Sequence, residues 1–230
     1  MTGDSSRETA ETIQAIAKRW QETDTDLLRH LFPLLAEGRP VPPCRLAQLS
    51  GRGEATVEAA LRLGHVDRDP QGRAVELFGL GQRPTRHRVL VGDVVLYSCC
   101  ALVALATSPL LGRTVSVESV DPVANRVVRL VVSPYGLEAV EPQGAVGCLV
   151  VTREDDVLSN VREAFCSHVC VFPSPEAAGE FLEADPRRYA VSIADFHAAA
   201  VRLAAAVWKQ PAHAARWPLP AALLTPRLIM

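Results

Sequence analysis

The adjacent thiols Cys99 and Cys100 are the first residues of this sequence whose types suit chemistry. They lie in an apolar stretch, residues 96–105 (LYSCCALVAL), where alanine and leucine predict a buried helix. A thiolate is a nucleophile and a soft ligand for soft metal ions. The alternative is that these thiols pack as small hydrophobic side chains, as buried free cysteine often does.

A second apolar stretch, residues 165–172 (FCSHVCVF), carries Cys166, His168 and Cys170 at every second position. Successive side chains of a strand point to opposite faces, so a strand here would place these three on one face. His168 could act as a general acid, or lower the pKa of Cys166 when charged. Whether Cys100 and Cys166 converge on one metal ion is left open by spacing alone.

Six short motifs follow one another in an order and spacing typical of one protein family. They are LLAEGRPV (34–41), YSCCAL (97–102), SPLLGRT (108–114), VSP (132–134), AVEP (139–142) and FCSH (165–168). With these motifs the sequence resembles the organomercurial lyase (alkylmercury lyase) family from about residue 27 to about residue 210. The order of the motifs carries the resemblance more than any single one of them.

The resemblance implies that Cys100 and Cys166 are the catalytic thiols and the mercury ligands. In the family's reaction a thiolate attacks the mercury of an organomercurial and a second thiol joins it. The carbon group leaves as a hydrocarbon once it is protonated, and Hg(II) stays on two sulfurs as the bound product. The resemblance implies a small-molecule substrate and no required cofactor.

The sequence departs from the family at the carboxylate that works with the thiols. That position is Val103 here, and valine neither donates a proton nor binds a metal ion. A second departure is Ser167, where many members have another cysteine. Cys99, His168 and Cys170 are therefore the candidate proton donors or accessory thiols.

Three functional hypotheses remain open at this point. The first is a carbon–mercury lyase with an altered proton route. The second is a non-lyase member of the same fold that uses its cysteines on a small electrophilic substrate or to bind a soft metal. The third is a transcription regulator that senses through its thiols.

Composition argues against several other classes of protein. A net charge of −2 gives no general attraction to nucleic acid or to an anionic membrane. Six cysteines in 230 residues are too few for a disulfide scaffold, and no apolar run approaches the roughly 20 residues of a membrane span. Without a signal-like start, these features predict a cytoplasmic protein.

Residues 1–85 are predicted to form a helical, winged-helix-like domain. Asp24 or Thr25 is the expected N-cap of a helix, and two short helices followed by a hairpin occupy residues 43–77. Such a unit can bind DNA, but Glu54 and Glu58 in the second short helix would face phosphates unfavourably. We therefore expect this domain to cover the active site, as the resemblance also implies, and we do not expect a nucleic-acid partner.

The predicted fold class is α+β, with the thiols in a second domain, residues 86–212. Alternating strands around Asp121 predict a hairpin, and helical periodicity is clear over residues 194–209. We therefore expect a mixed or antiparallel sheet flanked by helices, followed by a Pro-rich tail over residues 213–230. The oligomeric state is left open by the sequence.

Overall fold

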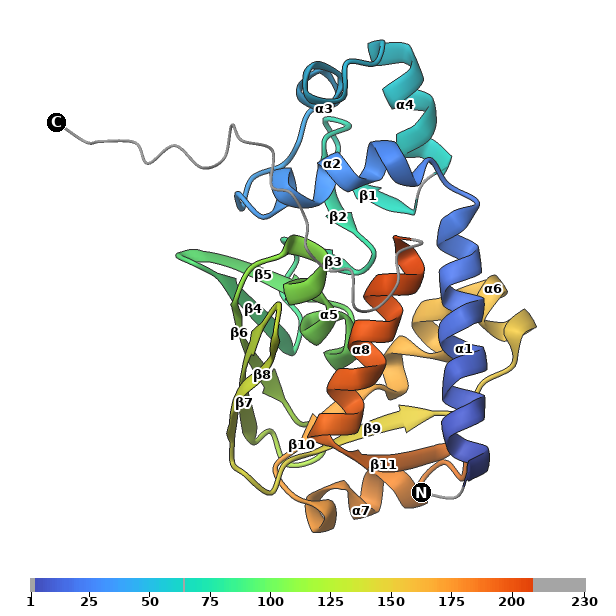
Figure 1. Ribbon diagram of the computed structural model, residues 1–230, viewed down its shortest axis with the longest axis vertical. Helices are drawn as coiled ribbons and strands as arrows, with labels where there is room; N and C mark the ends of the chain where they lie inside the picture. Colours follow the sequence, from blue (N-terminus) through green and yellow to red (C-terminus); the bar gives the residue numbers. More distant parts are fainter. Residues whose placement is uncertain (1–2, 64, 209–230) are drawn as a thin grey trace, which may run out of the picture.

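The computed structural model describes residues 3–63 and 65–208 of the chain. The end of the predicted core domain, at residue 212, and the predicted tail over residues 213–230 lie outside the described residues. The described part has helices and two antiparallel sheets, which confirms the predicted α+β class (Figure 1). Among these residues, none of the helices combines the length and apolarity that a membrane span needs.

Side-chain caps mark several helix starts, and one of them is the predicted N-cap Asp24. Asp24 accepts a hydrogen bond from Leu27 N at 3.1 Å, and Ser174 accepts one from Ala177 N at 3.3 Å. The helices are α1 (Gly3–Gln21), α2 (Thr25–Leu35), α3 (Pro43–Ser50), α4 (Glu54–Leu63), α5 (Ala101–Leu111), α6 (Glu154–Ala164), α7 (Pro175–Glu183) and α8 (Ile193–Val207), with a 3-10 turn η1 (Cys166–His168).

The strands form one large sheet and one small sheet. The large sheet has the order β1-β2-β3-β5-β4-β6-β7-β8, and the small sheet has the order β10-β9-β11. The strands are β1 (Val66–Arg68), β2 (Ala74–Leu77), β3 (Leu80–Gly81), β4 (His87–Val91), β5 (Val94–Ser98), β6 (Val115–Val120), β7 (Val127–Ser133), β8 (Gly136–Glu141), β9 (Val146–Val150), β10 (Cys170–Phe172) and β11 (Arg188–Ser192).

The large sheet continues across the predicted domain boundary at residue 85. Hairpin β1–β2 precedes that boundary, and β3 joins it to β5, which follows the boundary. Helices α3 and α4 and the hairpin lie at the predicted positions. Both the division at residue 85 and the winged-helix arrangement stay predictions.

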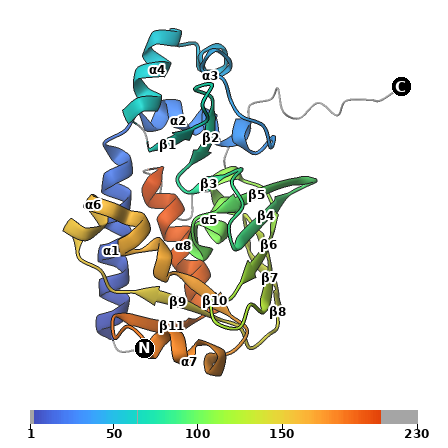
Figure 2. The same ribbon diagram turned by 180° about the vertical axis from the view of Figure 1, so that it is seen from behind.

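Helix α8 lies at the centre of the molecule, between α1 and α5 (Figures 1 and 2). Helix α5 is apolar on all sides, and all of its residues except Val103 and Pro109 are buried. A helix that is apolar all round has to be enclosed by other elements. Because α5 follows directly after Cys100, this enclosure also determines where the first thiols lie.

Both thiol stretches differ in part from the predicted elements. The helix begins at Ala101, not at residue 96, because residues 94–98 pair with β4 as the second strand of a hairpin. The prediction of one strand over residues 165–172 is wrong in its first half, where Cys166–His168 forms a 3-10 turn. His168 N donates to Phe165 O and Val169 N donates to Cys166 O, so the local backbone closes on itself before β10 begins.

One buried histidine of the large sheet predicts how stability depends on pH. His87 Nδ1 lies 2.6 Å from Ser119 Oγ, and burial, with the nearby Arg86 charge, lowers the pKa of His87 to about 3. Between about pH 6.5 and this value the unfolded chain binds a proton that the folded chain does not. The free energy of unfolding should therefore fall with decreasing pH in this window, by about 1.4 kcal/mol per unit from this group.

The variant His87→Asn keeps a polar atom near the Nδ1 position and removes the titration. We expect it to be less stable than the parent at pH 7, but to lose less stability between pH 6.5 and 4. Urea unfolding at several pH values measures both quantities. Equal pH slopes for the two proteins would contradict this assignment.

Candidate active site

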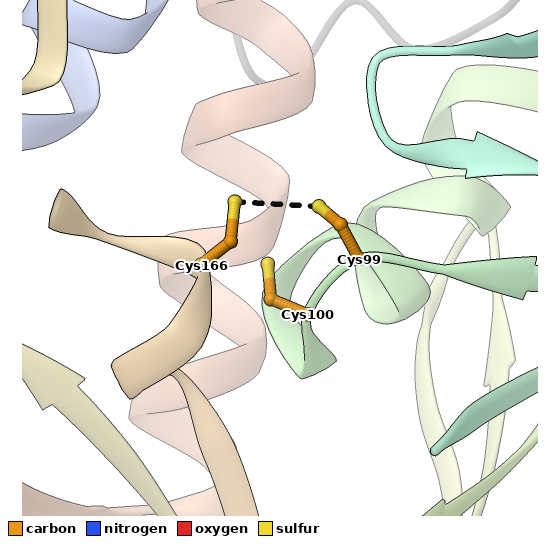
Figure 3. A group of neighbouring side chains, drawn as sticks. All are labelled: Cys99, Cys100 and Cys166. Atoms are coloured by element: carbon orange, nitrogen blue, oxygen red, sulfur yellow. Dashed lines mark hydrogen bonds between the residues drawn. The ribbon is translucent and has the colours of Figure 1, made fainter. Parts of the chain in front are cut away.

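Three sulfur atoms meet at the centre of the molecule. The Sγ atoms of Cys99, Cys100 and Cys166 all lie within 4.8 Å of one another. Cys99 Sγ donates a hydrogen bond to Cys166 Sγ at 3.3 Å, and Figure 3 shows the Cys100 sulfur directed toward this pair. Cys100 and Cys166 have only 0% and 8% of their surface exposed. The two thiol stretches therefore converge, which spacing alone did not establish.

Backbone hydrogen bonds hold the first two thiols in place. Cys99 N donates to Gly79 O at 2.7 Å, which ties Cys99 to the turn between β2 and β3. Ala101 N donates to Val169 O at 3.1 Å, and this bond ties the start of α5 to the segment after Cys166. The first N–H groups of a helix have no partner within the helix, so Val169 O satisfies a group that would otherwise be unpaired.

Gly79 leaves the space that the Cys99 sulfur occupies. A Cβ atom built on Gly79 would lie 2.2 Å from Cys99 Sγ, which is far inside van der Waals contact. Gly79 also has a φ of +72°, a left-handed conformation that side chains disfavour. Both the backbone turn and the position of the Cys99 thiol thus require glycine here.

The three sulfurs line a cavity of about 230 Å³. One part of its wall is apolar and comes from α1, α5, α8 and the turn after β2: Ile16, Trp20, Phe78, Val103, Ala106, Leu110, Leu203 and Val207. The other part is charged or polar: Arg19, His65, Asp67, Glu76, Ser159, Asn160 and Arg162. The thiols thus have access to both an apolar and a charged environment.

The three thiols are held as neutral groups at neutral pH. The hydrogen bond with Cys100, followed by burial, raises the pKa of Cys99, and the hydrogen bond with Cys166, followed by burial, raises that of Cys100. For Cys166 the hydrogen bond with Cys100 lowers the pKa, but the bond with Cys99 and burial outweigh it and the net shift is upward. The Arg162 charge opposes these shifts at Cys99 and Cys166.

Val103 lines the cavity from the first turn of α5, three residues after Cys100. The position that carries a carboxylate in the family therefore presents an apolar side chain to the cavity. Val103 widens the apolar part of the wall and supplies no proton.

Two other candidate residues lie away from the three sulfurs. His168 Nδ1 accepts a hydrogen bond from Arg188 Nε at 3.0 Å and lies 3.7 Å from Asp185 Oδ2. Burial and the charge of Arg188 lower the pKa of His168. Cys170 packs against Cys148 and Phe172 in a separate buried cluster, and burial raises its pKa to about 11. Neither residue lines the cavity of the three thiols.

Glu76 and Arg162 were not identified from the sequence, although both line this cavity. Glu76 has 7% of its surface exposed and is hydrogen-bonded to Arg162 Nη2. Burial raises the pKa of Glu76, while the Arg162 charge opposes that shift. In the sequence, Glu76 is an acidic residue between the apolar Val75 and Leu77. In a strand such alternation usually places the acidic side chain in solvent, so the pattern did not indicate a buried site.

Substitution of Gly79 tests how the Cys99 thiol is positioned. Gly79→Ala should displace the Cys99 side chain and impose left-handed strain of about 1–2 kcal/mol. Gly51→Ala is the matched control, because Gly51 has a φ of +69° and no atom within 4 Å of its added Cβ. We expect both variants to lose stability in thermal unfolding, and only Gly79→Ala to change the reaction rate of the buried thiols with a thiol reagent. Identical thiol kinetics in the two variants would contradict this.

Comparison with known proteins places the chain in a family. The family model for alkylmercury lyase (MerB) matches residues 80–207. An alkylmercury lyase of Staphylococcus epidermidis is 37% identical over 183 residues, which are 79% of this chain and 80% of the relative. One of Bacillus cereus is 38% identical over 170 residues, 74% and 76% of the two chains. One of Pseudomonas putida is 32% identical over 157 residues, 68% and 72% of the two chains.

A solved structure has the same fold. The crystal structure of the mercury-bound form of MerB2 matches with a TM-score of 0.71 and 18% identity, covering 87% of this chain and 99% of that one. This likeness concerns the arrangement of the elements. Together with the sequence matches, which span both thiol segments, it leads to one conclusion: this chain belongs to the alkylmercury lyase family.

Proposed function

We propose that this protein is an organomercurial lyase that cleaves a carbon–mercury bond and releases a hydrocarbon and Hg(II). The observation that carries the proposal is the meeting of the Cys100 and Cys166 sulfurs in one cavity, in a chain that belongs to the alkylmercury lyase family. Thiolates are the preferred ligands of soft metal ions, and two of them are needed to hold Hg(II) when the carbon group departs.

Each of the two thiols has a role in the reaction. One sulfur bonds to the mercury of R–Hg⁺ and gives up its proton, and the second sulfur then bonds to the same mercury and gives up another. The carbon–mercury bond breaks, and its electron pair takes one proton to form R–H. The sum is R–Hg⁺ and two thiols giving R–H, Hg(II) on two sulfurs and one H⁺. The chain's own groups account for every atom, so we propose that no cofactor is required.

The apolar wall is suited to the organic group of the substrate. An apolar protein cavity of about 150 Å³ is large enough to bind benzene, and the cavity here is about 230 Å³. Val103, Ala106 and Leu110 form a continuous apolar strip of α5 beside the sulfurs. We propose that this strip receives the methyl or phenyl group, and that Cys99 is an accessory third thiol beside the two mercury ligands.

Charge and thiol state support a small-molecule substrate and a reducing compartment. Arginines of the predicted winged-helix-like part are engaged by carboxylates: Arg52 with Asp24, Arg68 with Glu58, Arg73 with Asp69 and Arg83 with Asp67. Engaged arginines are poorly available to DNA phosphates, so we propose no nucleic-acid partner. All six cysteines are free thiols, which supports a cytoplasmic location.

An assay of hydrocarbon release tests the proposal. Methane from methylmercury and benzene from phenylmercury should be released by the parent in the presence of a small thiol that removes Hg(II). Hydrocarbon release by Cys100→Ser and by Cys166→Ser should fall to the level of buffer alone. A serine hydroxyl does not ionise near neutral pH and binds mercury poorly. Cys99→Ser should retain release, since both proposed mercury ligands remain.

Cys44→Ser is the matched control, because Cys44 is an exposed free thiol that does not line the cavity. This variant should release hydrocarbon as the parent does.

Val103→Asp restores the carboxylate at the family position and gives the decisive comparison. Release by Val103→Asp without release by the parent would rule out the native lyase function.

A further inference from the structure

A buried carboxyl group lines the cavity that contains the three thiols. Glu76 lies in β2, only 7% exposed, and faces the same cavity as Cys99, Cys100 and Cys166. Gly81 makes room for it: a Cβ atom built on Gly81 would lie 2.6 Å from Glu76 Cβ. Carboxylates are seldom buried unless they are paired, so this position calls for an explanation.

The partner of Glu76 comes from the helix that leads to the second thiol. Arg162, in α6, is hydrogen-bonded to Glu76 Oε1 and lies four residues before Cys166. Its charge also acts on the Cys99 and Cys166 thiols. On the other side, β2 leads into the turn whose Gly79 O accepts the hydrogen bond from Cys99 N. The carboxyl–guanidinium pair thus connects the two segments that carry the sulfurs.

The proposed reaction needs a group in the cavity that can both accept and donate a proton. The buried thiols are neutral and must lose protons before they bind mercury, whereas the departing carbon must gain one. Val103 can do neither. His168 and Cys170 lie outside this cavity. Glu76 is a carboxyl group that lines the cavity, and an ion pair with Arg162 fixes its position.

We propose that Glu76 is the proton shuttle of this site, held in place by Arg162 and carrying a proton from a thiol to the departing carbon. The inference rests on the proposed lyase function. As the first sulfur bonds to mercury, its proton passes to the Glu76 carboxylate, directly or through one water. When the carbon–mercury bond breaks, the electron pair on carbon takes that proton to give R–H, and Glu76 returns to the carboxylate. The proton of the second thiol goes to solvent.

The charges around Glu76 fit a group that must change protonation state. Burial raises its pKa, Asp67 raises it further, and Arg162 and Arg83 lower it. The net shift is upward, which moves the pKa of this carboxyl toward the range where a group can both accept and donate a proton. The titratable and charged groups that share the cavity with it are Arg19 of α1, His65 between α4 and β1, Asp67 of β1, Arg162 of α6 and the three thiols.

The test is Glu76→Gln, which keeps the shape of the side chain and an acceptor for Arg162 but cannot carry the proton. Single-turnover hydrocarbon release should fall by about 10²- to 10⁴-fold, the usual contribution of a positioned acid–base group. Stoichiometric binding of Hg²⁺, counted as loss of free thiols, should not change. Glu118→Gln is the matched control, because Glu118 pairs with Arg88 and Arg129 on the large sheet and lies outside the cavity.

The pH profile gives a readout that a structural role would not change. A carboxyl that is already protonated cannot accept the thiol proton. The ratio of parent rate to Glu76→Gln rate should therefore shrink as the pH falls through the Glu76 pKa. Glu76→Asp retains a carboxyl, so its rate should be lower than that of the parent but should depend on pH in the same way. It provides the same test if the glutamine variant does not fold.

The outcomes separate this inference from the function on which it rests. A parent that releases no hydrocarbon removes both the lyase function and the shuttle. A parent that releases hydrocarbon, with Glu76→Gln equally fast or with an unchanged pH ratio, overturns the shuttle alone. Slow release by Glu76→Gln with normal Hg²⁺ binding, and recovery in Glu76→Gln/Val103→Asp through a carboxyl on α5, supports the shuttle.

Discussion

The hydrogen bond from Ala101 N to Val169 O is the contact on which the arrangement of the thiols depends. It joins the first turn of the buried helix α5 to the backbone just after the Cys166 turn, at a distance of 3.1 Å. The donor is one of the N–H groups that a helix leaves unpaired at its start, and leaving it unsatisfied in the core would cost about 1–3 kcal/mol. This contact therefore joins the start of α5, next to Cys100, to the segment that carries Cys166.

Around this contact the cavity is divided between two kinds of environment. Its apolar wall comes from three helices, α1, α5 and α8, which pack side by side. Its charged part includes residues of β1, β2 and α6, where Arg162 pairs with both Glu76 and Asp67. Hydrogen bonds among the thiols, together with burial, raise their pKa values, while the Arg162 charge lowers those of Cys99 and Cys166. Reactive thiols are usually found where a positive charge lies beside a partly enclosed sulfur.

Local features of the fold could be predicted from the sequence, because local interactions determine them. Asp24 caps α2, and Asp121 closes the β6–β7 hairpin by accepting hydrogen bonds from Val123 N, Ala124 N and Arg126 N. Residues 165–172 were misjudged because a two-residue alternation over so short a stretch also suits a tight turn. The pairing of Cys100 with Cys166 was anticipated through family resemblance. The burial of Glu76 was not, because its partner Arg162 lies 86 residues away in the sequence.

The enclosure of the cavity by both α1 and α8 has a consequence for synthesis of the protein. Leu203 and Val207 of α8 complete the wall around sulfurs that come from residues 99–166. A chain emerging from the ribosome presents these thiols to the surrounding solution before the last wall exists, since synthesis proceeds from the amino terminus. During that interval soft metal ions and oxidants reach sulfur atoms that the finished molecule encloses. Incomplete chains therefore expose to organomercurials the thiols that the folded protein encloses.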